Sequence, residues 1–69
     1  MFIEKYTVQI KNLYNNKIKK VLVNANTSLE AHKLALDYTN ELTQDIAKIV
    51  DSEKNIVYTL ENGFLEYKS

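Results

Sequence analysis

The sequence predicts a small α+β domain in which one helix packs across one face of a four- or five-stranded, mainly antiparallel sheet, in the order ββαββ(β). Three observations predict this class. Residues 5–25 read as two alternating strands around an Asn-Asn pair, residues 27–42 have the apolar spacing of a helix, and residues 45–67 return to short β-branched and aromatic runs. A chain of 69 residues supports one apolar core, so we expect a single domain, residues 1–69.

The first hairpin is predicted from residues 5–14 and 17–25, which flank Asn15 and Asn16. Asn tolerates the positive φ that a two-residue type I′ turn requires. The pairs predicted from this turn are Tyr14 with Lys17, Ile10 with Val21, Val8 with Val23, and Tyr6 with Ala25. This register places the apolar side chains of both strands on one face, as strand alternation requires. On the opposite face it places Thr7 beside Asn24, Gln9 beside Leu22, Lys11 beside Lys20, and Leu13 beside Ile18.

A helix is predicted to begin after Thr27, which is a suitable N-cap because Glu30 follows three residues later and completes a capping box. We expect the helix to extend to about Leu42. The stripe expected to face the sheet consists of Ala31, Leu34, Ala35, Tyr38 and Leu42. Leu29, His32 and Leu36 lie on roughly the opposite side, so the helix has more apolar positions than one buried face needs.

Residues 45–50 and 55–60 predict a second hairpin around the polar turn 51–54. The Asn-Gly pair at Asn62 and Gly63 then predicts a turn into a short last strand, 64–67, with Leu65 beside Leu60. Two topologies fit this order. A right-handed crossover places the third strand beyond the first, or the late hairpin sets a strand parallel to the first. The second arrangement resembles the small immunoglobulin-binding β-grasp domains in element order and length, and this resemblance implies nothing about function.

Composition narrows the setting of the protein. Nine lysines balance nine acidic residues, but residues 1–20 carry a charge of +4. Glu4 and Lys5 interrupt any signal-peptide core, and no stretch approaches the roughly 18 apolar residues of a membrane span, so we expect a cytoplasmic protein. A chain rich in Lys, Asn, Ile and Tyr, without Arg, Pro, Trp or Cys, is typical of AT-rich coding DNA, which indicates a low-GC bacterium or its phages and mobile elements.

Enzyme chemistry finds little support in the sequence. Ser28 and His32 are one helical turn apart, but no acidic residue is placed to orient the histidine ring. Residues 51–62 start with the alternating oxygens of a calcium loop, but Ile56 and Asn62 occupy the positions that need glycine and glutamate. A single glycine excludes a glycine-rich phosphate loop. We therefore predict no catalytic residues, no metal site and no cofactor.

Surplus apolar side chains instead predict a non-enzymatic protein-interaction module that self-associates as a homodimer or binds a protein partner, with a role as an accessory or inhibitory protein of a phage or mobile element. Clustered exposed apolar residues mark binding surfaces, whereas scattered ones do not. The predicted interface residues are Leu29, His32 and Leu36 on the helix and Leu13, Ile18 and Leu22 on the outer sheet face. The alternative for the helix set is that residues 63–69 cover it within the chain.

Nucleic-acid binding is the second hypothesis. Lys11, Lys17 and Lys20 of the first hairpin would serve as phosphate contacts. The absence of arginine and of aromatic platforms on the outer face, together with zero net charge, makes this hypothesis the weaker one.

Overall fold

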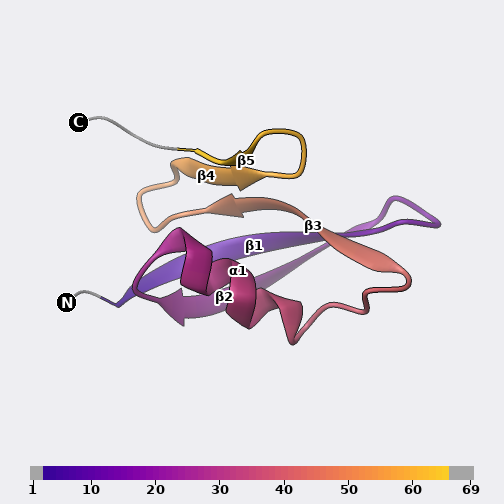
Figure 1. The fold of residues 1–69 in the computed structure, drawn as a ribbon, viewed down its shortest axis with the longest axis horizontal. Helices are drawn as coiled ribbons and strands as arrows, with labels where there is room; N and C mark the ends of the chain where they lie inside the picture. The colour runs from indigo at the N-terminus through magenta and orange to yellow at the C-terminus, as the bar shows by residue number, and fades with distance from the viewer. Residues whose placement is uncertain (1–2, 66–69) are drawn as a thin grey trace.

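The computed structural model describes residues 3–65 and shows a five-stranded sheet with one helix laid across it (Figure 1). The elements are β1 (Glu4–Asn12), β2 (Ile18–Ala25), α1 (Ser28–Leu36), β3 (Gln44–Val50), β4 (Ile56–Thr59) and β5 (Gly63–Phe64). The predicted α+β class is therefore confirmed. No helix within residues 3–65 has the length and apolar character needed to cross a membrane.

The sheet order is β2-β1-β3-β4-β5, and every neighbouring pair is antiparallel. The third strand thus lies beyond the first, as the crossover topology predicts. The β-grasp order does not form, because β1 is paired on both sides by antiparallel neighbours and has no parallel partner. Helix α1 connects β2 to β3 across β1 and packs on all three strands.

The first hairpin keeps its predicted faces but not its predicted pairs. Val8 pairs with Val21 and Tyr6 with Val23, so the predicted register is wrong by two residues. The loop spans residues 13–17, because the Asn12 side chain accepts hydrogen bonds from the backbone N–H groups of Tyr14 and Asn15. A shift of two residues returns each side chain to the same face, which is why the apolar face survives the error.

Helix α1 begins as predicted and ends six residues early. The Thr27 hydroxyl accepts from the Glu30 N–H at 3.1 Å, while the Glu30 carboxylate accepts from the N–H of Asn26. After Leu36 the backbone tightens into i→i−3 hydrogen bonds, and the Thr39 hydroxyl donates to the Ala35 carbonyl. These local bonds compete with the continuing helical ladder. The expected end at Leu42 is therefore wrong.

The second hairpin forms as predicted around Asp51, whose carboxylate accepts from the N–H groups of Glu53 and Asn55. In the last turn Gly63 has φ +72°, and Thr59 pairs with Gly63. The predicted proximity of Leu65 to Leu60 is wrong, because the Leu65 N–H donates to the Val57 carbonyl at 2.9 Å. Residues 66 and 67 of the predicted last strand lie outside the described residues.

The core lies between α1 and the sheet. Ala31 and Ala35 are fully buried against the strands, as predicted for the helix stripe. The predicted stripe also includes Leu34, Tyr38 and Leu42, but these side chains are 38%, 57% and 84% exposed, and Tyr38 and Leu42 follow the end of the helix. The strands contribute the rest of the buried cluster, which includes Tyr6, Val8, Ile10, Val23, Ala25, Ile46, Ile49 and Val57.

Hydrogen exchange will test the corrected hairpin. We expect the amides of Val8, Ile10, Val21 and Val23 to be among the slowest to exchange in dilute solution, because they belong to the paired centre of the sheet and its core. NMR-detected exchange with residue assignments measures this. Rapid exchange at these four amides, or cross-strand contacts in the register of the two-residue turn, would contradict the hairpin described here.

Candidate interaction surfaces

Three rings pack together where α1 meets the β4–β5 hairpin. The centroid of the His32 ring lies 4.8 Å from that of Tyr58 and 5.5 Å from that of Phe64, and both contacts are edge-on. The centroids of the Tyr58 and Phe64 rings are 4.9 Å apart. Such aromatic pairs each contribute about 0.5–1.5 kcal/mol beyond their buried area. The contact fixes the short β5 strand to the helix, although α1 lies over β2, β1 and β3.

Local geometry explains how these rings meet. Gly63 adopts the left-handed φ of +72° after a three-residue turn, and this conformation pairs Tyr58 directly with Phe64. Tyr58 also pairs with Ile49 of β3, which places its ring on the sheet face that carries α1. The sequence prediction missed Tyr58 and Phe64. The Asn-Gly turn was the available signal, but it was assigned the wrong register.

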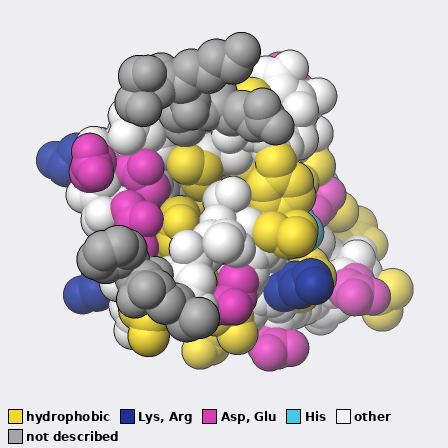
Figure 2. Space-filling model, turned by 60° about the vertical axis from the view of Figure 1, so that its left-hand side comes forward, with side chains coloured by type: hydrophobic (Ala, Val, Ile, Leu, Met, Phe, Trp, Pro, Cys, Tyr) yellow, Lys and Arg dark blue, Asp and Glu magenta, His cyan; other side chains and the backbone are white. Residues whose placement is uncertain are grey.

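The helix leucines extend this aromatic contact to the surface. Leu29 and Leu36 lie three residues before and four residues after His32, so all three share one side of α1. Leu29 is 51% exposed, Leu36 41% and Phe64 43%. We name Leu29, His32, Leu36, Tyr58 and Phe64 the helix-side cluster. Figure 2 shows hydrophobic side chains reaching the surface beside the histidine.

The predicted outer-sheet set does not gather into one patch. We call the sheet face opposite α1 the open face. On it, Ile18 lies opposite Lys11, and Leu22 lies opposite Thr7, in place of the predicted Leu13 and Gln9. Ile18 and Leu22 are four residues apart on one strand, about 13 Å, with Lys20 between them on the same face. Leu13 lies in the 13–17 loop, where its N–H donates to the Thr43 carbonyl.

The lysines of the open face form a row that crosses three strands. Gln9 of β1 is flanked by Lys20 of β2 and Lys48 of β3. Lys11, in the next row of this face, lies opposite Asp45. Lys17 lies in the 13–17 loop, away from that row. The structure thus joins one of the three predicted lysines, Lys20, to Lys48, which the sequence prediction missed because β3 is distant in the chain.

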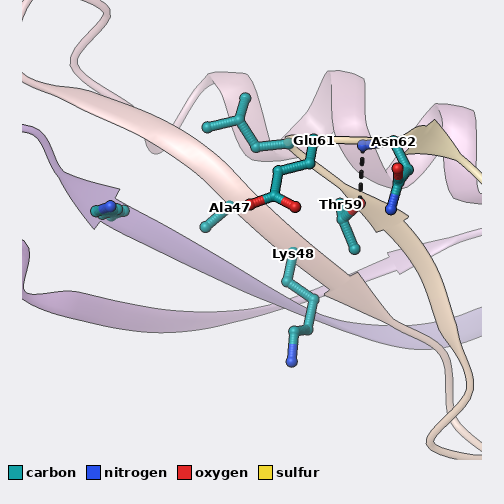
Figure 3. Close-up of a pocket in the computed structure, with 7 residues that line it drawn as sticks. Ala47, Lys48, Thr59, Glu61 and Asn62 are labelled. Atoms are coloured by element: carbon teal, nitrogen blue, oxygen red, sulfur yellow. Dashed lines mark hydrogen bonds between the residues drawn. The ribbon is translucent and has the colours of Figure 1, made fainter.

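A shallow pocket of about 320 Å³ lies next to this row, between β3, β4 and the turn that follows β4 (Figure 3). Lys48 and Thr59 are cross-strand partners in its floor, and the Asn62 N–H donates to the Thr59 hydroxyl at 3.1 Å. Glu61 and Lys11 line it as well, so charges of both signs meet there. Mixed charge of this kind does not select for an anionic ligand.

The only histidine is held by aromatic side chains. Ser28 and His32 share the first turns of α1, and the His32 ring packs edge-on against the rings of Tyr58 and Phe64. Within residues 3–65, no group of three or more His, Cys, Asp or Glu side chains is arranged to hold a metal ion.

Two tyrosines have altered acidity. Burial, and then the nearby Asp45 carboxylate, raises the pKa of Tyr58 above its ordinary value of 10.0. Burial raises the pKa of Tyr6 as well, and Glu4 and Asp51 add to the effect. Folding therefore favours the protonated phenol at both positions, and the stability gained in this way is present below the ordinary pKa and is lost as the pH rises through the folded-state pKa.

The Tyr58→Phe substitution tests the link between the raised pKa of Tyr58 and the stability of the fold. We expect the free energy of unfolding to fall as the pH rises above 10.0, and to fall less steeply in Tyr58→Phe, because the phenol that must ionise in the packed ring cluster is gone. Urea denaturation at a series of pH values measures it. Tyr14→Phe, at a side chain that is 80% exposed, is the control. An identical pH dependence in both variants would contradict the assignment.

A comparison with protein-family models, with curated proteins and with solved structures finds no match to this chain. The candidate surfaces therefore depend on the geometry described above. They are the helix-side cluster, whose apolar side chains are partly exposed on rigid elements, and the lysine row of the open face.

Proposed function

We propose that this protein is a non-enzymatic protein-interaction module that self-associates and presents the helix-side cluster to a protein partner. The observation that carries the proposal is a set of half-exposed apolar side chains: Leu29 and Leu36 lie on the same side of α1 as His32, and the Phe64 ring packs against those of His32 and Tyr58. Aromatic residues are enriched in the centres of protein interfaces, and rigid apolar groups bind without a large ordering cost.

The energetics of a small domain support this reading. A chain of this size gains only about 3–5 kcal/mol from its core. At roughly 25 cal/mol per Å² of apolar area, covering the exposed parts of two leucines and a phenylalanine contributes a few kcal/mol. Binding at the helix-side cluster would therefore be comparable with the whole stability of the fold, and it would stabilise the folded chain by mass action.

The non-enzymatic character is supported by the surroundings of His32, since a histidine that acts as a base needs an orienting partner for its second nitrogen, and its ring contacts here are aromatic. The role in a phage or mobile element remains part of the proposal and is supported by the Lys-, Asn-, Ile- and Tyr-rich composition.

Nucleic-acid binding is the second candidate, and the Lys20–Gln9–Lys48 row is the observation that favours it. Strands in a sheet are about 4.8 Å apart, so the two lysines of the row stand roughly 10 Å from one another on one face. Asp45 opposite Lys11, and Glu61 in the adjoining pocket, place negative charge beside the same row. This arrangement weakens attraction to phosphates, so we rank the candidate second.

The double substitution Leu29→Gln and Leu36→Gln tests the helix-side cluster. We expect the fold to be retained, with a free energy of unfolding within about 1 kcal/mol of the parent, because both side chains are already half exposed. We expect titration of the purified partner, found by quantitative affinity capture, to show loss of binding. Calorimetry and urea denaturation give the two readouts.

Leu13→Gln with Leu42→Gln is the matched control, since these leucines are 50% and 84% exposed and lie outside the helix-side cluster. The control should bind as the parent does. Unfolding of a monomeric Leu29→Gln, Leu36→Gln variant would show that the leucines pack within the chain. Unchanged binding would show that they are ordinary surface.

Replacing Lys11, Lys17 and Lys20 by Gln separates the two candidates. We expect the parent protein to show no measurable binding to duplex or single-stranded nucleic acid at physiological salt, so the triple variant should behave identically in fluorescence anisotropy. Two results together would make nucleic-acid binding the first candidate. The parent would form a micromolar complex that weakens as salt is added, and the triple variant would bind all nucleic-acid sequences more weakly to the same degree.

A further inference from the structure

Within residues 3–65, strand β2 leaves one edge of the sheet unpaired along its eight residues, whereas β5, the strand at the opposite edge, has two residues. The Lys17 carbonyl accepts from the Asn12 N–H at 2.8 Å, so alternate backbone groups from Lys17 onward point toward β1. The groups that point outward belong to the intervening residues, which are Ile18, Lys20, Leu22 and Asn24. Such a row is a template for another strand.

The structure leaves this row open at its centre. Among the turn, loop and cap hydrogen bonds of residues 3–65, none involves the backbone of these four residues. A pocket of about 280 Å³ lies against the edge at residues 22–24, and Leu34, Asp37 and Tyr38 form its other wall. Leu34 is 38% exposed and Tyr38 57%. The end of α1 thus supplies apolar contacts beside the edge and does not cover it.

We propose that a second copy of this chain occupies this edge, so that the two β2 strands pair antiparallel around a two-fold axis perpendicular to the sheet beside Leu22. The inference rests on the self-association proposed above and names its surface. A two-fold axis makes the contact self-complementary, so each residue of β2 must find a compatible partner within the same eight-residue strand.

Charge and the matching of the exposed leucines together select the register. Centred on Leu22, the pairing sets Leu22 opposite Leu22 of the second copy, Lys20 opposite Asn24, and Lys19 opposite Ala25, so no lysines face one another. Centred on Lys20, it would oppose like charges, which is destabilising. Centred on Val21, it would set Lys20 against Leu22 and leave the exposed leucines unmatched. The Leu22 register also lets the two Leu22 backbones exchange both hydrogen bonds.

Such a dimer has a defined shape. A two-fold axis perpendicular to the sheet keeps both helices on one face, and two five-stranded sheets become one continuous sheet. Leu34 and Tyr38, which line the pocket beside the edge in each copy, then lie near the axis on the helix side, where the two pockets meet. Each helix-side cluster faces away from the axis toward β4 and β5, so the dimer presents two copies of it to partners.

Cysteine cross-linking tests the register, because the chain contains no cysteine. Directly opposed, hydrogen-bonded residues have Cα atoms about 5.5 Å apart, which is within the range of a disulfide. We expect Leu22→Cys to form a disulfide-linked dimer on mild oxidation, with twice the 8.0 kDa mass of one chain. Ile18→Cys is the matched control on the same edge, since the two copies of residue 18 would lie eight residues apart along the strand and should not link.

Leu22→Lys tests the association itself. The side chain is 61% exposed, so the substitution leaves the monomer folded, but it sets two lysines opposite one another across the axis. In sedimentation equilibrium we expect the dissociation constant to rise at least about tenfold. Leu60→Lys, at a leucine that is 47% exposed and away from β2, should associate as the parent does. In the parent, the amides of Lys20 and Leu22 should become protected from exchange as concentration rises.

Each alternative result overturns the inference in a recognisable way. A parent protein that stays monomeric up to about 1 mM rejects self-association on any surface, while partner binding by the helix-side cluster can still be measured. A dimer that Leu22→Lys leaves intact, but that Leu29→Gln with Leu36→Gln dissociates, rejects the β2 surface and supports the helix-side cluster in its place. Cross-linking of Ile18→Cys but not Leu22→Cys rejects the register.

Discussion

The close contact of Ala31 and Ala35 with the sheet is the constraint on which the rest of the structure depends. Both residues are fully buried, and their small side chains let the helix backbone approach the strands. In so short a helix, these two positions decide which side of α1 is inside. With that side fixed, Leu29, His32 and Leu36 lie on another side of α1, where the two leucines are half exposed and His32 meets the rings of the β4–β5 hairpin.

The position of the helix also divides the molecule into two unlike halves. α1 crosses from β2 to β3 over β1, so the sheet beneath it is covered, while β4 and β5 extend beyond it. The rings of Tyr58 and Phe64 pack between the helix and strands β4 and β5, and they form the aromatic part of the helix-side cluster. On the other side, α1 ends beside the unpaired edge of β2. One packing arrangement thus generates both the helix-side cluster and the open edge.

Charge shapes what these surfaces can bind. The lysines of the first hairpin lie on the open face and on the β2 edge, where exposed lysine ordinarily discourages edge-to-edge pairing. The arrangement in β2 is selective, however, because Lys19 and Lys20 are both near the start of the strand and Asn24 and Ala25 near its end. In the register centred on Leu22 an antiparallel copy therefore opposes lysine with neutral residues, whereas registers centred on Lys19 or Lys20 bring like charges together.

The sequence by itself determined the element types, the faces of the first hairpin and the inward side of the helix. Alternation in residues 5–25 and the capping box at Thr27 and Glu30 act over a few residues, so they can be recognised from the sequence without the tertiary structure. Only the tertiary structure decided the two-residue shift in the hairpin, the helix end at Leu36 and the position of β3 beside β1. Turn side chains and long-range strand pairing set these features, and alternation cannot distinguish registers that differ by two.

The candidate surfaces divide in the same way between local and long-range features. Leu29, His32 and Leu36 could be placed on one side of the helix from spacing alone, because helical spacing is local. Tyr58, Phe64 and Lys48 joined the candidate surfaces only through pairing between strands.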